Sequence, residues 1–147
     1  MKEVPGWTAR QLGPEDARVL ASWPATVSVE VDGLGDVLFC HATPRNETEI
    51  LLRTTAEARA LRAFAGVTES VVIYGHTHMQ FDRMVGRTRV INVWSAGMPF
   101  GGSGADWLLL GPDVELRHTS YDLASTAEAI RHSSCPQAEE AAAELGD

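Results

Sequence analysis

Val71-Val72-Ile73-Tyr74-Gly75-His76-Thr77-His78 predicts both a central strand of the fold and part of the candidate site. Its first four residues form a short apolar run rich in β-branched side chains, which predicts a strand buried on both faces. Gly75 then gives the backbone freedom to turn, and in extended backbone His76 and His78 would leave on the same side because they lie two residues apart. The stretch therefore predicts a buried strand that ends directly in two imidazoles.

A second apolar strand is predicted to end in the same way. Val37-Leu38-Phe39-Cys40 is a continuous apolar run, and His41 follows it at once. Ligands of open α/β sheets gather just beyond the carboxyl ends of the strands, so two such ends bring three imidazoles into one region. Neutral imidazole is the commonest nitrogen ligand of zinc, manganese and iron. We therefore predict His41, His76 and His78 as metal ligands, with a purely structural role for all three as the alternative.

The remaining pattern predicts a mixed α/β fold. Thr26–Val31 alternates apolar and polar residues, so it is predicted to be a half-buried strand that forms a hairpin with the run before His41. Two further hairpins are predicted, one around Gly86-Arg87 and one around Gly111-Pro112-Asp113. Helices are predicted within residues 8–22, 54–66 and 125–134. Thr54 and Ser125 are the predicted capping residues at the starts of the last two helices.

The composition is that of an ordinary globular protein. The 147 residues include 12 Lys+Arg and 20 Asp+Glu, so 12 − 20 gives a net charge of −8, and 44% of the residues are hydrophobic. This length predicts one domain over residues 1–147, in which residues 134–147 form a loosely held acidic tail. An acidic chain without a Lys/Arg cluster is not expected to bind nucleic-acid backbone.

The same sequence indicates where the chain works. It contains no apolar run near the roughly 18 residues that a membrane span needs, so no membrane partner is expected. Cys40 and Cys135 are far apart and lie outside any C-x-x-C pair. Two isolated thiols favour a reducing compartment, which predicts a cytoplasmic protein.

Three elements in order resemble the calcineurin-like metallophosphoesterases, and the run Trp107–Leu110 and the later Tyr121-Asp122 look like their small single-domain bacterial members. Gly75-His76-Thr77-His78 is similar to the G-H-T-H element of that family, and Cys40–Pro44 looks like its upstream H-G-(S/T)-P element. Ile91–Pro99 resembles the following N-P-G-S-V-G segment, although Val93 and Trp94 depart from it, as does Ala96. The resemblance implies the C-terminal half of an αββα sandwich, a mixed sheet with flanking helices.

The resemblance also implies a metal-dependent phosphohydrolase that acts on a small phosphomonoester or phosphodiester. In the family, the histidines that match His41 and His76 ligate one metal, and the histidine that matches His78 ligates the other. Mn²⁺, Fe, Zn²⁺, Ni²⁺ or Co²⁺ could occupy such a mixed nitrogen and oxygen site. No catalytic residue beyond these metal ligands is expected in the chain.

The family's first-half motifs D-x-H, G-D and G-N-H-(D/E) have no match here, because Asp32-Gly33 and Gly35-Asp36 are turn residues before the strand that leads to His41. Those motifs supply the remaining ligands and the bridging carboxylate. Three imidazoles without that anionic bridge would hold one metal at most. The chain is therefore expected to be a truncated phosphohydrolase that is inactive alone and that either self-associates or binds a complementing N-terminal half. The alternative is a non-catalytic metal- or partner-binding module that retains the second-half fold.

Overall fold

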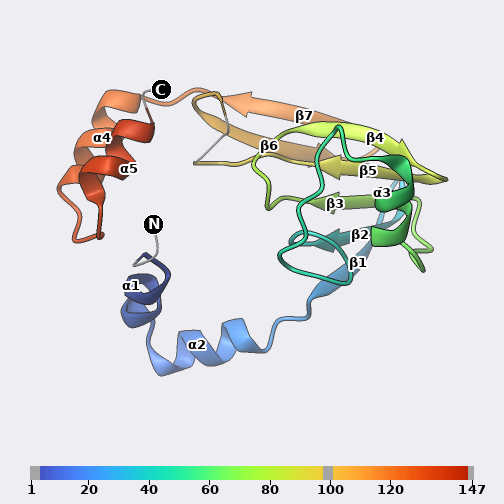
Figure 1. Cartoon of the computed structure of the whole chain (residues 1–147), viewed down its shortest axis with the longest axis horizontal. Helices are drawn as coiled ribbons and strands as arrows, with labels where there is room; N and C mark the ends of the chain where they lie inside the picture. Colours follow the sequence, from blue (N-terminus) through green and yellow to red (C-terminus); the bar gives the residue numbers. More distant parts are fainter. Residues whose placement is uncertain (1–3, 98–100, 146–147) are drawn as a thin grey trace. The chain divides into compact units, whose positions relative to one another are not determined.

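The computed structural model of the chain describes residues 4–97 and 101–145. Two compact units divide the chain, one formed by Ala25–Thr119 and the other by Met1–Pro24 together with Ser120–Asp147. The elements of Figure 1 are, in chain order, α1 (Val4–Gln11), α2 (Pro14–Ala21), β1 (Thr26–Val31), β2 (Gly35–Cys40), α3 (Glu57–Ala63), β3 (Val71–Tyr74), β4 (Phe81–Val85), β5 (Thr88–Asn92), β6 (Ala105–Leu110), β7 (Val114–Thr119), α4 (Leu123–Arg131) and α5 (Ala138–Glu144).

A five-stranded mixed sheet forms the centre of the Ala25–Thr119 unit. Its strand order is β1-β2-β3-β5-β4, with β2, β3 and β5 parallel and with β1 and β4 antiparallel at the two edges. All four residues of β3 are buried, as the apolar run predicts. The predicted hairpins also form, since β1 pairs with β2, β4 with β5 and β6 with β7. These pairings confirm the predicted mixed α/β fold.

Each face of this sheet has its own apolar core. On one face, Leu38, Val72 and Val90 pack with Ala60 and Phe64, which come from α3 and the residue after it. On the opposite face, the core consists of Val37, Val71, Ile73 and Ile91, and side chains of the β6–β7 hairpin such as Leu108 and Leu110 pack against it. The unit is therefore layered as helix, five-stranded sheet and two-stranded sheet (Figure 1), which is the predicted mixed sheet with flanking helices.

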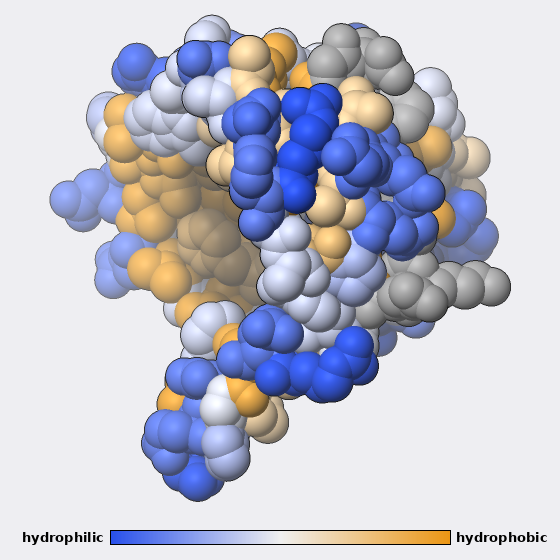
Figure 2. All heavy atoms as spheres, turned by 90° about the vertical axis from the view of Figure 1, so that its left-hand side faces the viewer, coloured by the Kyte–Doolittle hydropathy of each residue, from blue (hydrophilic) through white to orange (hydrophobic). Residues whose placement is uncertain are grey.

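The edge strand β1 differs from its prediction. Val27 and Val29 are 45% and 44% exposed, although the alternating pattern predicts that their face is buried. The register pairs Val27 with Phe39 and Val29 with Val37, so both valines lie on the face that the β6–β7 hairpin covers further along the sheet. Hydrophobic residues are also visible beside hydrophilic ones on the surface drawn in Figure 2. Within this unit, the apolar face of the sheet therefore extends beyond the part that the β6–β7 hairpin covers.

The helix caps also differ from the predicted ones. α3 has Ala56 as its N-cap instead of Thr54. The N-cap of α4 is Asp122, whose carboxylate accepts hydrogen bonds from the backbone N–H groups of Ala124 and Ser125 at 3.0 and 3.1 Å. A carboxylate is favoured there because it both accepts these bonds and faces the positive end of the helix dipole.

The two C-terminal helices belong to the second unit and pack against each other. α5 covers part of the predicted acidic tail, and its Ala142 is 3% exposed. That the tail is loosely held stays a prediction. None of the helices in the described part of the chain is both long enough and apolar enough to cross a membrane.

Candidate metal centre

The parallel pairing of β2 with β3 brings two of the predicted metal ligands together. His41 follows the last residue of β2, and Gly75 and His76 follow the last residue of β3. The Gly75 N–H donates to the His41 carbonyl oxygen at 3.0 Å, which extends the pairing past the ends of both strands. His41 Nε2 then lies 3.1 Å from His76 Nδ1, and the two ring centroids are 4.9 Å apart. The predicted meeting of imidazoles at neighbouring strand ends is therefore present for His41 and His76.

The turn that carries His76 and His78 is not extended backbone. Their φ angles are +67° and +51°, in the left-handed region that residues other than glycine seldom adopt. The expectation that both side chains leave on one side of extended backbone was therefore wrong, because the chain turns sharply here. Such backbone costs about 1–3 kcal/mol per residue and persists only where the surroundings hold it. His78 lies two residues beyond His76 in this same turn.

Asn92 is the residue that holds this turn, and no role was predicted for it. It ends β5 opposite Tyr74 and is 0% exposed. Its Nδ2 donates to the Gly75 carbonyl oxygen at 2.6 Å and to Thr77 Oγ1 at 3.0 Å, while its Oδ1 accepts from the Trp94 N–H at 3.1 Å. A polar residue at the end of the apolar run of β5 was the signal that could have identified it.

Cys40 is poorly suited to join the two histidines as a metal ligand. Its side chain packs against the apolar core on the α3 face of the sheet. Burial raises the pKa of the Cys40 thiol to about 11, because a thiolate is poorly solvated there. The thiol is therefore protonated at neutral pH, and the thiolate is the form that binds metals.

The two imidazoles fit part of a cation site. Metal–nitrogen bonds of 2.0–2.1 Å to a shared ion would place nitrogens 3.1 Å apart at an angle of roughly 95–100°, close to common coordination angles. The same separation also suits a direct hydrogen bond between a protonated and an unprotonated nitrogen. Within residues 4–97 and 101–145, no group of three or more His, Cys, Asp or Glu side chains is arranged to hold a metal. The set of His41, His76 and His78 therefore stays a prediction.

Comparison with known proteins identifies the family. A calcineurin-like phosphoesterase superfamily domain matches residues 10–113, so the chain belongs to that superfamily, as the resemblance predicted. Membership supports a phosphoesterase-type function in general, and proteins of the family generally bind divalent metals. No curated protein matches the chain.

Two solved structures share the fold. The chain is similar to a metallophosphoesterase from Sphaerobacter thermophilus, with a TM-score of 0.70 and 22% identity over 95% of this chain and 64% of that one. It is also similar to a hypothetical protein from Pyrococcus horikoshii OT3, with a TM-score of 0.74 and 19% identity over 92% of this chain and 55% of that one. The chain thus spans 55% and 64% of the length of these two proteins, and the likeness concerns the fold alone.

We expect Asn92→Asp to loosen the turn that carries His76 and His78. A carboxylate oxygen would replace the amide nitrogen that donates to Gly75 and Thr77, and it would face the Gly75 carbonyl oxygen. The expected loss is about 2–4 kcal/mol of unfolding free energy together with shifted ring resonances of His41 and His76, measured by urea denaturation and NMR. Asn46→Asp is the matched control, since among the described residues the Asn46 side chain accepts hydrogen bonds from Thr48 through its oxygen and donates none. Equal effects of the two substitutions would contradict the role of Asn92.

Proposed function

We propose that this chain carries part of the metal-binding site of a metal-dependent phosphohydrolase, whose substrate is a small phosphomonoester or phosphodiester. The observation that carries the proposal is the 3.1 Å separation of His41 Nε2 and His76 Nδ1 at the ends of adjacent parallel strands. The chain's membership of a phosphoesterase superfamily supports this use of the histidines. The free thiols Cys40 and Cys135 support a cytoplasmic protein.

In this proposal, His41 and His76 hold one divalent cation through their unprotonated ring nitrogens, and His78 adds a ligand from the same turn. Mn²⁺, Fe, Zn²⁺, Ni²⁺ or Co²⁺ suits imidazole together with oxygen ligands, and manganese is the metal that we would test first. When bound, such a cation supplies Lewis-acid polarisation of a phosphoryl oxygen and lowers the pKa of bound water. The chain itself fixes the imidazoles, through the hydrogen bond from Gly75 to His41 and through the contacts of Asn92.

The proposed site is completed by residues outside these 147. No D-x-H, G-D or G-N-H element of the family type occurs in the sequence, and the chain spans 55% and 64% of its two structural neighbours. Without a bridging carboxylate, the mutual repulsion of two cations limits the chain to one. We infer that it has little phosphoesterase activity alone and that a segment carrying the missing motifs completes it, from the same or another polypeptide.

The non-catalytic alternative is a metal- or partner-binding module with the same fold. It is favoured by the arrangement of the possible ligands, since within the described parts of the chain no group of three or more His, Cys, Asp or Glu side chains is placed to hold a metal. A third interpretation, in which the histidines are structural, is favoured by the direct contact between the two rings. Metal affinity separates this third interpretation from the other two.

We expect the metal-free chain to bind one Mn²⁺ or Zn²⁺, and His76→Ala to weaken this binding at least about tenfold. In other metal sites, changing a group that only hydrogen-bonds to a metal ligand already costs that much. Isothermal titration calorimetry of the purified chain measures it. His132→Ala is the control, since the His132 side chain is 73% exposed and bonds within its own helix. Equal affinity of all three chains would show that the histidines are structural.

Turnover of a chromogenic phosphodiester with added Mn²⁺ should stay close to the rate of buffer alone. The physical reason is that one cation without a bridging carboxylate cannot hold the attacking and leaving oxygens from both sides. Turnover of ordinary enzymatic efficiency that His76→Ala abolishes would contradict the proposed incompleteness, although not the proposed metal site.

Self-association should accompany the uncovered apolar face of β1, because Val27 and Val29 expose hydrophobic surface beside an unpaired sheet edge. Size-exclusion chromatography with light scattering should give a mass above that of a 15.9 kDa monomer. Replacing both valines by threonine, which keeps the β-branched shape, should shift the mass toward the monomer. A monodisperse monomer of the unaltered chain would contradict the expected self-association.

A further inference from the structure

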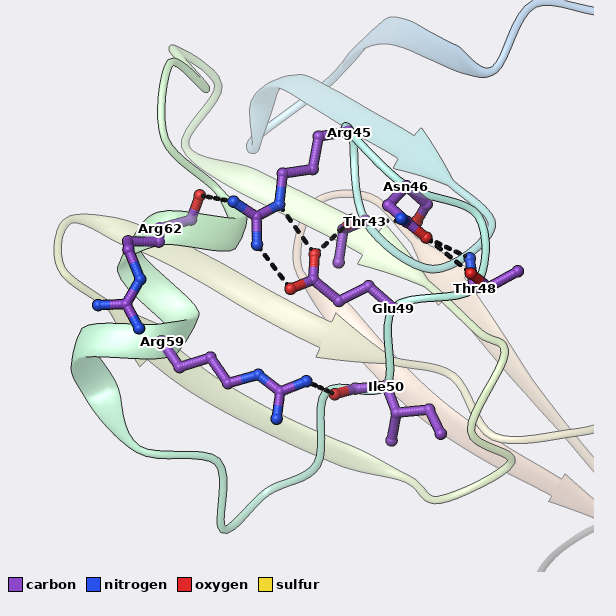
Figure 3. Close-up of polar contacts among 8 residues, drawn as sticks. All are labelled: Thr43, Arg45, Asn46, Thr48, Glu49, Ile50, Arg59 and Arg62. Carbon is purple, nitrogen blue, oxygen red and sulfur yellow. Dashed lines mark hydrogen bonds and ion pairs between the residues drawn. The ribbon is translucent and has the colours of Figure 1, made fainter.

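A second polar site lies on the segment that follows His41. A cavity of about 510 Å³ is formed there, and its lining consists of Arg45, Asn46, Thr48, Glu49, Ile50 and Arg59. The first five come from the loop between β2 and α3, and Arg59 comes from α3 (Figure 3). The three histidines of the candidate metal centre are not part of this lining.

Glu49 and Arg45 form the fixed wall of the cavity. Arg45 donates from Nε and Nη2 to the two carboxylate oxygens of Glu49 at 2.9 and 2.6 Å, and Thr43 Oγ1 donates to the same carboxylate at 3.1 Å. Arg45 Nη1 also donates to the Arg62 carbonyl oxygen at 3.0 Å, which ties the loop to α3. These bonds hold the pKa of Glu49 below its usual range, first through Arg45, so the carboxylate is charged at neutral pH.

Arg59 is the cation of this cavity with donors to spare. Its Nη2 donates to the Ile50 carbonyl oxygen at 3.0 Å, and this is the side chain's one hydrogen bond among the residues that the structure describes. A guanidinium carries five N–H donors, so most of those of Arg59 have no protein acceptor there. The lining holds two guanidinium groups, of Arg45 and Arg59, and one carboxylate, of Glu49, which leaves one net positive charge (Figure 3). This local charge contrasts with the chain's net charge of −8.

We propose that this cavity binds a phosphate group, with Arg59 as its principal contact and Arg45 as the residue that positions the loop. The fork of a guanidinium matches the oxygens of a phosphate, which it can bind with two parallel hydrogen bonds. Ile50 is 56% exposed and offers an apolar wall for an organic group esterified to that phosphate. The site needs no cation, so the inference goes beyond the proposed metal-dependent activity and does not rest on it.

The test uses the full chain in a chelator at low salt, titrated with inorganic phosphate and with phenyl phosphate and followed by calorimetry. We expect saturable binding of both, tighter for phenyl phosphate, and a loss of at least about tenfold in Arg59→Gln, because charge-assisted hydrogen bonds are lost. Arg87→Gln removes the same charge from the β4–β5 turn and should change the affinity less than about twofold. A lack of saturable binding, or equal losses of affinity in the two variants, would overturn the proposal. Tighter binding of benzoate than of phenyl phosphate would also overturn it.

Glu49→Gln is a second variant, and it should change the affinity for phosphate in the opposite direction. It removes the competing carboxylate, so the net charge of the cavity rises from one to two positive and the fork of Arg45 becomes available. Phosphate should then bind several-fold more tightly, provided that circular dichroism shows an unchanged fold. Weaker binding in that folded variant would overturn the proposal. The His76→Ala chain should bind phosphate as the unaltered chain does, and its failure to do so would overturn this inference while leaving the proposed metal site intact.

Discussion

The parallel pairing of β2 with β3 is the constraint on which the candidate site depends. The register sets Phe39 beside Ile73, and the hydrogen bond from Gly75 to His41 continues it beyond the strands. His76 follows Gly75 and for this reason lies beside His41. Because side chains alternate between the faces of a strand, a slip of one residue would turn the buried side chains of β3 to the opposite faces and separate the two imidazoles. The apolar cores on both faces of the sheet fix the register against such a slip.

The same arrangement explains how the chain tolerates unusual backbone at this place. His76, His78 and Trp94 all have positive φ angles. Asn92 connects the turn at His76 and His78 with the segment at Trp94, because its side chain is hydrogen-bonded to Gly75, Thr77 and Trp94. A buried amide that satisfies donors and acceptors on both sides offsets part of the conformational cost. The strained turn carries the predicted ligands, as is common where function demands a particular geometry.

Local signals predicted most of the fold. The β-branched run of β3, the apolar run of β2 and the turn residues between the paired strands act over a few positions, and each formed the expected element. The misses depend on partners distant in sequence or on competition between neighbours. Val27 and Val29 are exposed because the β6–β7 hairpin does not extend over their part of the sheet, and Asp122 caps α4 because its carboxylate competes with the predicted cap. No local sequence pattern predicts the hydrogen bonds of Asn92 or the cavity beside Arg59, since each joins segments that only the fold brings together.

X-ray absorption spectroscopy of the zinc-loaded chain measures whether His41 and His76 share one cation. A shared cation gives scattering from at least two imidazoles at about 2.0 Å from zinc, with one fewer in His41→Ala. A spectrum with oxygen ligands alone, or one that His41→Ala leaves unchanged, would contradict it.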